Sequence, residues 1–236
     1  LFGACRTKIK TYASGGLWLS QSIDSLLKNT QNFLDQGFRS MKIRVGSTNW
    51  KNDVERVKEV RNAIGPDIEL MADINQALEP KQAIQLGEKL EEYDLLWLEE
   101  PVASNNREGH AEVRSSLSIP IASGENEYSL SGMREMIEAK ACDILMPDLQ
   151  RIGGISEMRK VANLAESHNL PISTHIFTEH SLSVAGSVTN CLSVEHMPWF
   201  SKLFNEQIYV INGYIDIPER PGTGFTFNES YIKLIN

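Results

Sequence analysis

The stretches Ile68-Glu-Leu-Met-Ala-Asp73 and Leu95-Leu-Trp-Leu-Glu99 are short apolar runs that each end on an acid. Runs of four to eight mostly apolar residues are typical of buried strands. Asp73 and Glu99 are 26 residues apart, and Glu125, which follows a third apolar run, comes 26 residues later. That interval has the length of one strand and one helix. The sequence therefore predicts repeated βα units that each place an acid at the carboxyl end of a strand.

The same alternation continues along the chain. Strands are predicted at residues 8–12, 40–45, 68–73, 95–99, 119–122, 144–147, 172–175 and 193–195. Amphipathic helices are predicted at residues 23–34, 54–64, 80–93, 108–117, 132–139, 156–168 and 181–190. For the second helix, Asp53 is the expected N-cap and Gly65-Pro66 the expected stop. Eight strands that are each followed by a helix or loop favour a (β/α)₈ barrel of the TIM type.

Alternation alone would fit an open doubly wound sheet equally well. The positions of the polar residues favour the barrel, because Asp148 and His175 end two further strands and are 27 residues apart. The carboxyl ends of barrel strands all face one mouth, whereas in an open sheet they lie along an edge. We therefore expect a catalytic barrel at residues 1–200. Residues 201–236 form a separate C-terminal segment, with a hairpin predicted at Asn212-Gly213.

Composition excludes several classes of partner. The net charge is −8, and the chain has no run of Lys or Arg, so binding to nucleic acid or to an anionic membrane is not expected. No apolar run approaches the ~20 residues of a membrane helix, and the first residues lack the apolar stretch of a signal peptide. The three cysteines form no CxxC pair and are expected to be reduced and buried. A cytoplasmic location is the resulting prediction.

Asp73, Glu99 and Glu125 are the candidate ligands of a metal ion. Any one of them alone is better explained as a helix cap or an exposed loop acid. Three at equal spacing, after three apolar strands, would repel one another at the mouth unless a cation lay between them. Ligands that are all oxygen favour Mg²⁺, Mn²⁺ or Ca²⁺ over zinc.

His175 and Asp148 are a candidate base and its partner, because a carboxylate that orients a histidine yields a base near neutral pH. Glu195 ends the last strand and would act as a protonated hydrogen-bond donor if its surroundings are apolar. Lys42 and Arg44 are two apart on a predicted strand and so share one face, which requires anions nearby.

Seven motifs together resemble the enolase superfamily, in its mandelate racemase subgroup. They are MKIRVG (41–46), MADINQ (71–76), WLEEP (97–101), ASGEN (122–126), MPDLQRIGG (146–154), STHIF (173–177) and RPGTGF (220–225). They occur in the family's order and span nearly the whole chain. The resemblance implies the barrel fold and abstraction of the proton α to a carboxylate, giving an enediolate.

The resemblance also implies a role for each candidate residue. Asp73, Glu99 and Glu125 would ligate Mg²⁺ (Mn²⁺ is the alternative ion), His175 would be a base paired with Asp148, Glu195 would donate a hydrogen bond to the enediolate, and Asn75 and Gln76 would bind substrate. Lys42 would neutralise the substrate carboxylate. The partner is therefore a small carboxylic acid, and such relatives commonly form homo-oligomers.

Arg44 departs from the family pattern, since the subgroup often has a basic Lys at this position. An arginine stays protonated at neutral pH, so it is a clamp rather than a base. With His175 as the single clear base, the sequence predicts a lyase that dehydrates an acid sugar, an aldonate or aldarate, to a 2-keto-3-deoxy acid. The alternatives are a racemase or epimerase of a 2-hydroxy acid and a non-catalytic barrel that binds sugar acids or metal. A Schiff-base aldolase is less favoured, because its chemistry would leave the three acids without a role.

The resemblance carries one further expectation about the chain. Family members have an N-terminal α+β capping domain before the barrel, whereas this sequence begins with LFGACRTKIK, close to the first predicted strand. The C-terminal segment would complete such a cap. We therefore expect the sequence to be a fragment of a longer protein, with an open mouth and weak or no activity in this form.

Overall fold

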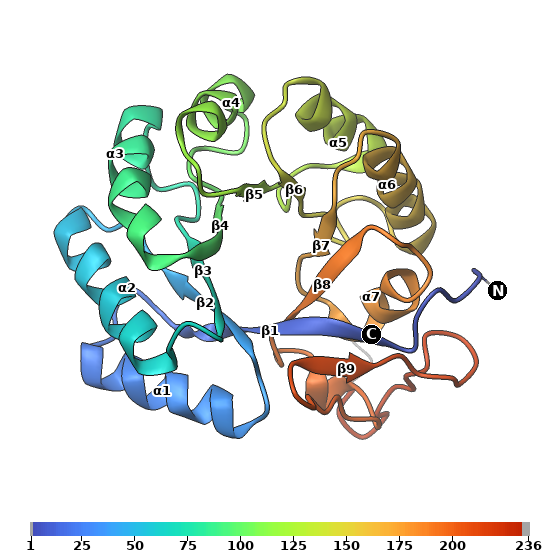
Figure 1. The fold of residues 1–236 in the computed structure, drawn as a ribbon. Coiled ribbons are helices and arrows are strands. Elements are labelled where there is room, and N and C mark those ends of the chain that lie inside the picture. Colours follow the sequence, from blue (N-terminus) through green and yellow to red (C-terminus); the bar gives the residue numbers. More distant parts are fainter. Residues whose placement is uncertain (1, 233–236) are drawn as a thin grey trace.

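Eight parallel strands close into a barrel in the computed structural model, which describes residues 2–232 (Figure 1). The strands are β1 (Lys8–Leu17), β2 (Ser40–Arg44), β3 (Glu69–Asp73), β4 (Leu95–Glu99), β5 (Ile121–Ser123), β6 (Ile144–Leu145), β7 (Ile172–Thr174) and β8 (Cys191–His196). Each pairs with the next, and β1 closes the ring by pairing with both β8 and β2. The predicted (β/α)₈ barrel is confirmed.

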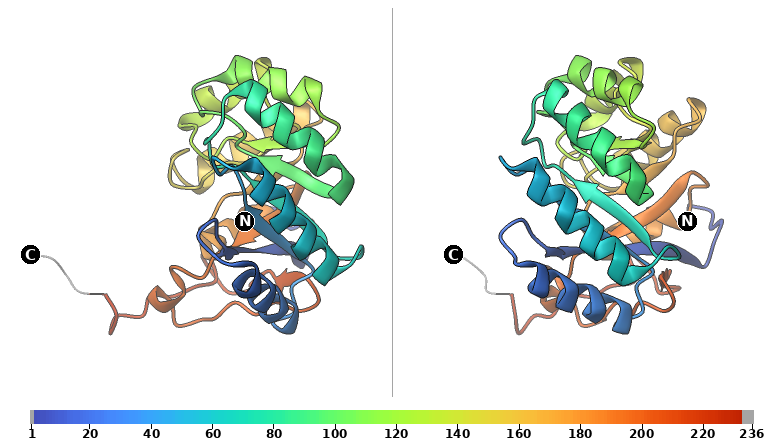
Figure 2. Two further views of the ribbon diagram at one scale, coloured as in Figure 1. Left: turned by 90° about the vertical axis from the view of Figure 1, so that its left-hand side faces the viewer. Right: turned by 60° about the vertical axis from the view of Figure 1, so that its left-hand side comes forward.

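Seven α-helices of the described residues form the outer layer around the strands (Figures 1 and 2). They are α1 (Ile23–Asp35), α2 (Trp50–Ile64), α3 (Pro80–Leu90), α4 (Arg107–Ser116), α5 (Ser129–Glu138), α6 (Ile155–Ser167) and α7 (Thr178–Ala185), with short 3₁₀ helices η1 (Glu91–Tyr93) and η2 (Ser201–Leu203). Their apolar faces pack on the strands and create two large core clusters outside the ring.

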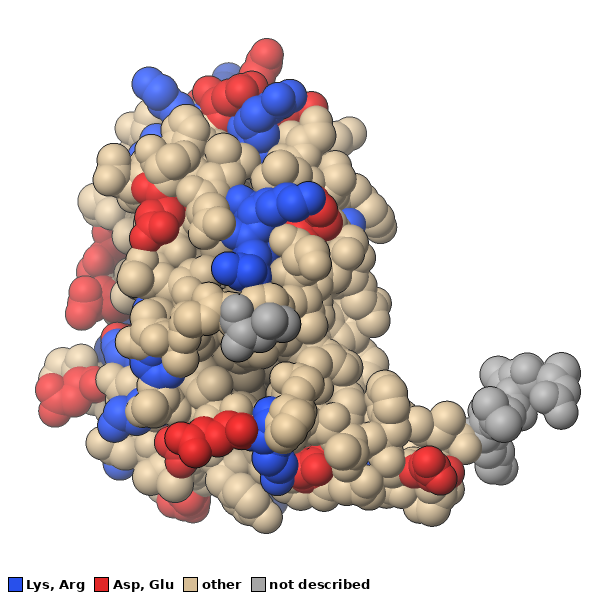
Figure 3. Space-filling view, turned by 90° about the vertical axis from the view of Figure 1, so that its right-hand side faces the viewer, with Lys and Arg blue, Asp and Glu red and all other residues tan. Residues whose placement is uncertain are grey.

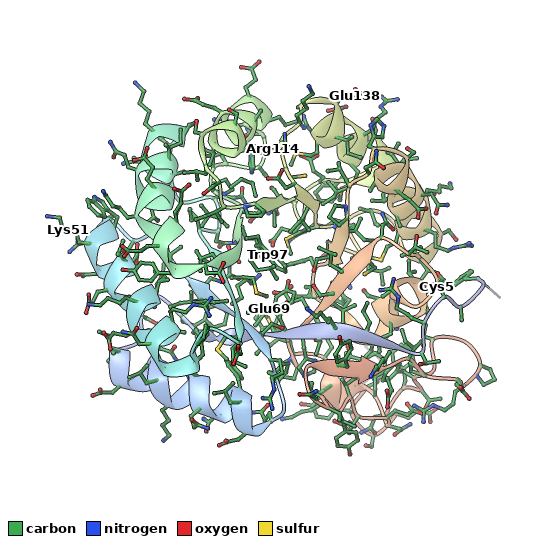
Figure 4. All side chains as sticks on the ribbon, in the orientation of Figure 1. Cys5, Lys51, Glu69, Trp97, Arg114 and Glu138 are labelled. Carbon is green, nitrogen blue, oxygen red and sulfur yellow. The ribbon has the colours of Figure 1, made fainter. Side chains whose placement is uncertain are left out.

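A third, smaller core cluster fills the inside of the barrel. It consists of Tyr12, Met71, Trp97, Ala122, Ile144 and Met146, all buried. Figure 4 shows Trp97 within the ring of strands, and its indole meets the ring of Tyr12 edge-on at 5.3 Å. Side chains therefore plug the barrel, and the polar residues beyond the plug lie on a solid floor.

The first strand is longer than its predicted range of residues 8–12. Its amino-terminal part pairs with β8, and its pairing with β2 joins Ala13 to Met41 and Leu17 to Ile43 with an irregular register between them. Gly15 lies in this irregular stretch with a φ of +85°. A glycine pair in a strand weakens the prediction of a continuous strand, which is why the extension was missed.

The start of α2 differs from the prediction. The helix begins at Trp50 after the cap position Asn49, and Asp53 lies inside its first turns instead of capping it. The Asp53 carboxylate is fully buried and accepts hydrogen bonds from the backbone of Gly46 and Ser47, and from the Ser47 hydroxyl. Asp53 thus ties the loop after β2 to α2. The predicted stop is confirmed, since α2 ends at Ile64 with Gly65 as its C-cap.

The last helix and the C-terminal turn also differ in detail. Ile176 and Phe177 have left-handed backbones, so α7 starts directly after them at Thr178 and ends before the predicted residue 190. Asn212 and Gly213 have positive φ, as a two-residue hairpin turn requires. The strand that follows, β9 (Tyr214–Asp216), pairs antiparallel with β1 at the edge of the barrel (Figure 1).

The surface carries charges of both signs. Figure 3 shows one face on which separate groups of Lys and Arg and of Asp and Glu are scattered over a mostly uncharged surface. Within residues 2–232, no helix is long and apolar enough to cross a membrane.

Candidate active site

The three predicted ligand acids lie at the ends of three neighbouring strands. Asp73 and Glu99 are the last residues of β3 and β4 and are partners in the sheet, while Glu125 lies two residues after β5. Asp73 and Glu99 are fully buried, and Glu125 is 6% exposed. The barrel therefore gathers at its mouth the acids that the sequence spacing singled out.

Lys42 lies among these carboxylates. Its Nζ is 2.5 Å from Glu99 Oε1, 3.1 Å from Asp73 Oδ2 and 3.0 Å from Glu195 Oε1. Burial alone would lower the pKa of Lys42, but the neighbouring carboxylates raise it well above its ordinary value. Arg44, two residues along β2, forms an ion pair with Asp73. The acids at the mouth are thus the anions that the two cations of β2 require.

Glu99 is held on both of its oxygens. Lys42 contacts Oε1, and the indole N–H of Trp97 donates to Oε2 at 2.9 Å. Burial, followed by the charge of Asp73, raises the pKa of Glu99 well above its usual range. Burial also raises the pKa of Glu125. This concentration of negative charge gives a cation at the mouth a strong electrostatic advantage.

The donors at the mouth have the chemistry of a hard-cation site. Asp73, Glu99 and Glu125 offer only oxygen, which suits Mg²⁺. In the described part of the chain, however, no three acid, histidine or cysteine side chains are close enough together to enclose an ion. Lys42 and Arg44 neutralise Asp73 and Glu99 in this arrangement. The residue types fit a divalent cation.

His175 and Asp148 form a close pair beside these acids. His175 Nδ1 lies 2.7 Å from Asp148 Oδ2, and His175 Nε2 lies 3.3 Å from Glu125 Oε2. The other Asp148 oxygen accepts from the backbone N–H groups of Gln150 and Arg151. Burial lowers the pKa of His175, but the hydrogen bond to Asp148 and the nearby charges of Glu125 and Glu195 outweigh it, and the net shift is upward. The pair has the geometry of an oriented base whose Nε2 is directed away from its partner.

Glu195 was expected to be a protonated hydrogen-bond donor only if its surroundings were apolar. Its surroundings are charged rather than apolar, because Lys42 and His175 lie beside it and the backbone N–H of Ile176 donates to it at 2.9 Å. Burial would raise the pKa of Glu195, but these partners lower it to about 2. In this arrangement Glu195 is an ionised acceptor, not a protonated donor.

Of the two predicted substrate-binding residues, Asn75 and Gln76, one lines the cavity and the other does not. Asn75 lines the cavity at the mouth, as a substrate-binding residue must. Both side chains donate to Glu100, Asn75 at 3.4 Å and Gln76 at 3.2 Å, but Gln76 also accepts from the backbone of Ser104 at 2.9 Å and does not line the cavity. The predicted contact of Gln76 with substrate is therefore not supported, because its amide is used to hold the buried Glu100.

A cavity of about 690 Å³ occupies the mouth of the barrel. The lining residues are Trp18, Leu19, Ser20, Arg44, Val45, Ile74, Asn75, Ala77, Glu125, Arg151, His175, Ile176 and Trp199. Trp18 lies in the stretch at residues 14–19, which the sequence indicates as a specificity loop, whereas no sequence pattern singles out Arg151 or Trp199. Arg151 donates to the Glu125 carbonyl at 2.7 Å, a contact that no spacing rule predicts. The contact of Trp97 with Glu99 could have been predicted from the sequence, because Trp97 precedes Glu99 by two residues and so lies on the same face of β4.

Fold and site together define a (β/α)₈ barrel with a carboxylate cluster and an Asp–His pair at its carboxyl mouth. The chain belongs to the family described as enolase C-terminal domain-like, whose model matches residues 25–231. The resemblance to the enolase superfamily is thus confirmed.

Curated relatives include acid-sugar dehydratases. L-talarate/galactarate dehydratase of Salmonella typhimurium is 35% identical over 229 residues, which are 97% of this chain and 58% of that protein. Arabinonate dehydratase of Saccharolobus solfataricus is 28% identical over 244 residues, which are 99% of this chain and 65% of that protein. The chain therefore spans about three fifths of the length of these relatives.

Solved structures agree with this assignment. L-talarate dehydratase from Polaromonas sp. JS666, complexed with Mg and L-glucarate, has a TM-score of 0.93 and 34% identity over 96% of this chain and 64% of its own. An enolase from Bradyrhizobium, complexed with magnesium and mandelic acid, has a TM-score of 0.90 and 36% identity over 97% of this chain and 62% of its own. These family members bind magnesium together with a small carboxylate.

Proposed function

We propose that the protein is a Mg²⁺-dependent hydro-lyase that converts an acid sugar to a 2-keto-3-deoxy acid. The observation that carries the proposal is the contrast between two faces of the cavity. His175, oriented by Asp148, is a competent base on the β7 side, whereas Arg44 on the β2 side remains protonated. A single base suffices for dehydration, while a two-base racemase needs one on each face.

Asp73, Glu99 and Glu125 would hold the metal ion. Arg151 and Trp97 support that assignment, because they fix Glu125 and Glu99 from outside the cluster. When bound, Mg²⁺ acts as a Lewis acid for the substrate carboxylate and makes the α proton more acidic. Mn²⁺, with the same preference for oxygen donors, is the alternative ion.

Arg44, which lines the cavity, would orient the substrate carboxylate, and Lys42, buried among the acids, would add its positive charge from below. Both are on β2, and both keep their positive charge because burial is outweighed by the carboxylates around them. Cations fixed at the site stabilise the negative charge that develops on the carboxylate as the proton leaves. Asn75, at the end of β3, would donate or accept a hydrogen bond to a substrate hydroxyl from its place in the cavity wall.

His175 would remove the α proton through Nε2, since Nδ1 carries the proton shared with Asp148. The electron pair of the broken C–H bond would form the double bond to the β carbon, and the β-hydroxyl would depart with the proton held on His175 Nε2, as water. The resulting enol would rearrange to the 2-keto acid. Atoms and charge balance without an oxidant or reductant.

The relatives support the reaction type and leave two substrate classes open. Talarate and galactarate are dicarboxylic acids, whereas arabinonate is a monocarboxylic acid. A further relative, D-xylonate dehydratase of Haloferax volcanii at 37% identity, is also named for a monocarboxylic acid. We further propose a homo-oligomer in the cytoplasm, with residues 201–236, of which the structure describes 201–232, completing a capping domain.

A screen of aldonic and aldaric acids with Mg²⁺, carried out on the barrel joined to its capping domain, tests the proposal. We expect 2-keto acid to form from at least one acid, to depend on added Mg²⁺, and to disappear in the His175→Asn variant. Interconversion of epimers without loss of water would contradict the hydro-lyase and favour the racemase.

A further inference from the structure

Glu100 is a buried acid that belongs neither to the three candidate ligands nor to the cavity lining. It comes directly after Glu99, the last residue of β4, and is 1% exposed. Its backbone has a φ of +41°, which is uncommon for a residue other than glycine. Burying a carboxylate costs free energy unless its oxygens are well hydrogen-bonded, so the contacts of this side chain indicate what it does.

Three side-chain amides hold the Glu100 carboxylate. Asn126 donates to Oε1 at 2.7 Å, and Gln76 and Asn75 donate to Oε2 at 3.2 and 3.4 Å. The backbone makes the same connections. The Gln76 N–H donates to the Glu100 carbonyl at 2.8 Å, and the Glu100 N–H donates to the Ala122 carbonyl at 3.0 Å. Glu100 therefore binds the chain on both sides of β4.

These contacts join the two loops that carry the outer candidate ligands. In the barrel, β4 lies between β3 and β5. Asn75 is two residues after Asp73, and its backbone N–H donates to Asp73 Oδ1 at 2.8 Å. Asn126 directly follows Glu125. The carboxylate of Glu100 thus connects the neighbour of one ligand acid to the neighbour of another.

The loop after β3 needs support of this kind. Asn75 and Gln76 both have left-handed backbones, with φ of +50° and +65°. Residues other than glycine keep such a conformation where surrounding contacts fix it. The amide contacts with Glu100, and the Ser104 N–H that donates to Gln76, supply those contacts. They fix the backbone that leads from Asp73 to Asn75 in the cavity wall.

We infer that Glu100 is a positioning residue that ties the loops after β3 and β5 to β4 and thereby sets the spacing of the acids that hold the metal ion. Partners that orient metal ligands from outside typically contribute about 10- to 100-fold to metal affinity. A carboxylate accepts on both oxygens, whereas an amide has one acceptor oxygen, so glutamine here would turn an NH₂ group towards another NH₂ group. The inference rests on the proposed function for the assignment of Asp73, Glu99 and Glu125 to Mg²⁺.

Two substitutions, made in the barrel joined to its capping domain, test the inference through Mg²⁺ affinity measured by calorimetry. Burial raises the pKa of Glu100 to about 7, so measurements at about pH 8.5 keep the carboxylate ionised and its titration out of the comparison. Glu100→Gln should weaken Mg²⁺ binding by about tenfold. Asn126→Ala keeps the charge of Glu100 and should weaken binding in the same direction, because it cuts the connection to the loop after β5. Saturating Mg²⁺ should restore most of kcat in both variants, since neither removes a reacting group.

Glu127→Gln is the matched control. Glu127 is a buried acid on the same loop as Asn126, 8% exposed, and its partner is the Arg107 guanidinium at 2.8 Å rather than an amide. Loss of this ion pair should lower the free energy of unfolding and leave Mg²⁺ affinity unchanged. An equal loss of Mg²⁺ affinity in the control would show that any damage to this loop has the same effect, and would overturn the inference.

The other outcomes separate the inference from the proposed function. Unchanged Mg²⁺ affinity in Glu100→Gln would overturn the inference and leave the dehydratase standing. A loss in Glu100→Gln without one in Asn126→Ala would also overturn it, because charge alone would then explain the loss. Losses in both variants of a protein that forms no keto acid would support the positioning role and overturn the dehydratase. An unaltered protein that does not bind Mg²⁺ would overturn both.

Discussion

Asp148 and His175 are joined twice, once through their side chains at 2.7 Å and once as partners of a parallel β-bridge. The backbone N–H of His175 also donates to the carbonyl of Pro147. The sheet therefore fixes the ring and its carboxylate relative to each other. A base positioned in this way needs no loop movement to become oriented, which supports its assignment as the group that takes the α proton.

Replacing His175 should abolish catalysis while the fold persists. We expect His175→Asn to lower kcat by at least about 10³-fold and Asp148→Asn by about 10²-fold, because the second variant keeps the ring but loses the carboxylate that orients it. Steady-state kinetics and thermal unfolding measure the two effects. His168→Asn, at an exposed histidine that caps α6, should keep full activity. Normal turnover by His175→Asn would remove the histidine from the mechanism.

Arg44→Lys should add a second base, on the β2 side of the cavity. A lysine amine can lose its proton, which the guanidinium does not do at neutral pH, so the variant should exchange the α proton of the opposite epimer. Exchange is followed by NMR in deuterated solvent. Arg44→Gln is the control, since it removes the charge without adding a base. Equal exchange in both variants would show that the β2 side chain does not set stereochemistry.

Lys42→Met should leave several buried acids without their counter-charge. Removing one partner of a buried ion pair typically costs about 3–5 kcal/mol, and we expect a loss of that size in urea unfolding. Mg²⁺ should restore more stability to this variant than to the unaltered protein, because it replaces the lost cation. Lys10→Met is the control: Lys10 pairs with Glu69 at 46% side-chain exposure, and its loss should cost less than about 1 kcal/mol. A Lys42→Met protein of normal stability would contradict this view of the site.

His196 should make stability depend on pH. Burial lowers its pKa to about 4 from an ordinary value of 6.5, and its Nδ1 has no hydrogen-bond partner. A histidine with a depressed pKa contributes fully above pH 6.5 and loses that contribution as the pH falls towards 4, here at most about 3 kcal/mol. Unfolding between pH 7 and 5 should therefore be less pH-dependent in His196→Phe, which keeps a ring against Phe38. The same change of unfolding free energy with pH in both proteins would show that His196 is not the group responsible.

The sequence predicted the parts of the site that depend on strand ends. Asp73, Glu99, Asp148 and His175 lie at or beside strand ends because the apolar runs before them have the length of strands, and a closed barrel brings all such ends together. Lys42 was predictable as an inward cation from its register on β2. These positions follow from local pattern and one topological rule.

Other features depend on contacts that local pattern does not encode. Asp53 resembles an N-cap in sequence, yet it lies inside the helix, where its carboxylate accepts hydrogen bonds from the backbone N–H groups of Gly46 and Ser47. Gln76 follows the candidate ligand Asp73, yet its amide donates to Glu100, which comes directly after β4. Trp199 lies in a loop after β8, and only the closure of β8 on β1 places it in the cavity with Trp18.

Proton exchange at the α carbon in deuterated solvent tests the one-base mechanism most directly. With Mg²⁺ and a reactive acid sugar, we expect 2-keto-3-deoxy acid as the product and recovered substrate that has kept its configuration, since only His175 reaches the α carbon. Deuterium in both epimers of recovered substrate, without loss of water, would contradict the one-base mechanism.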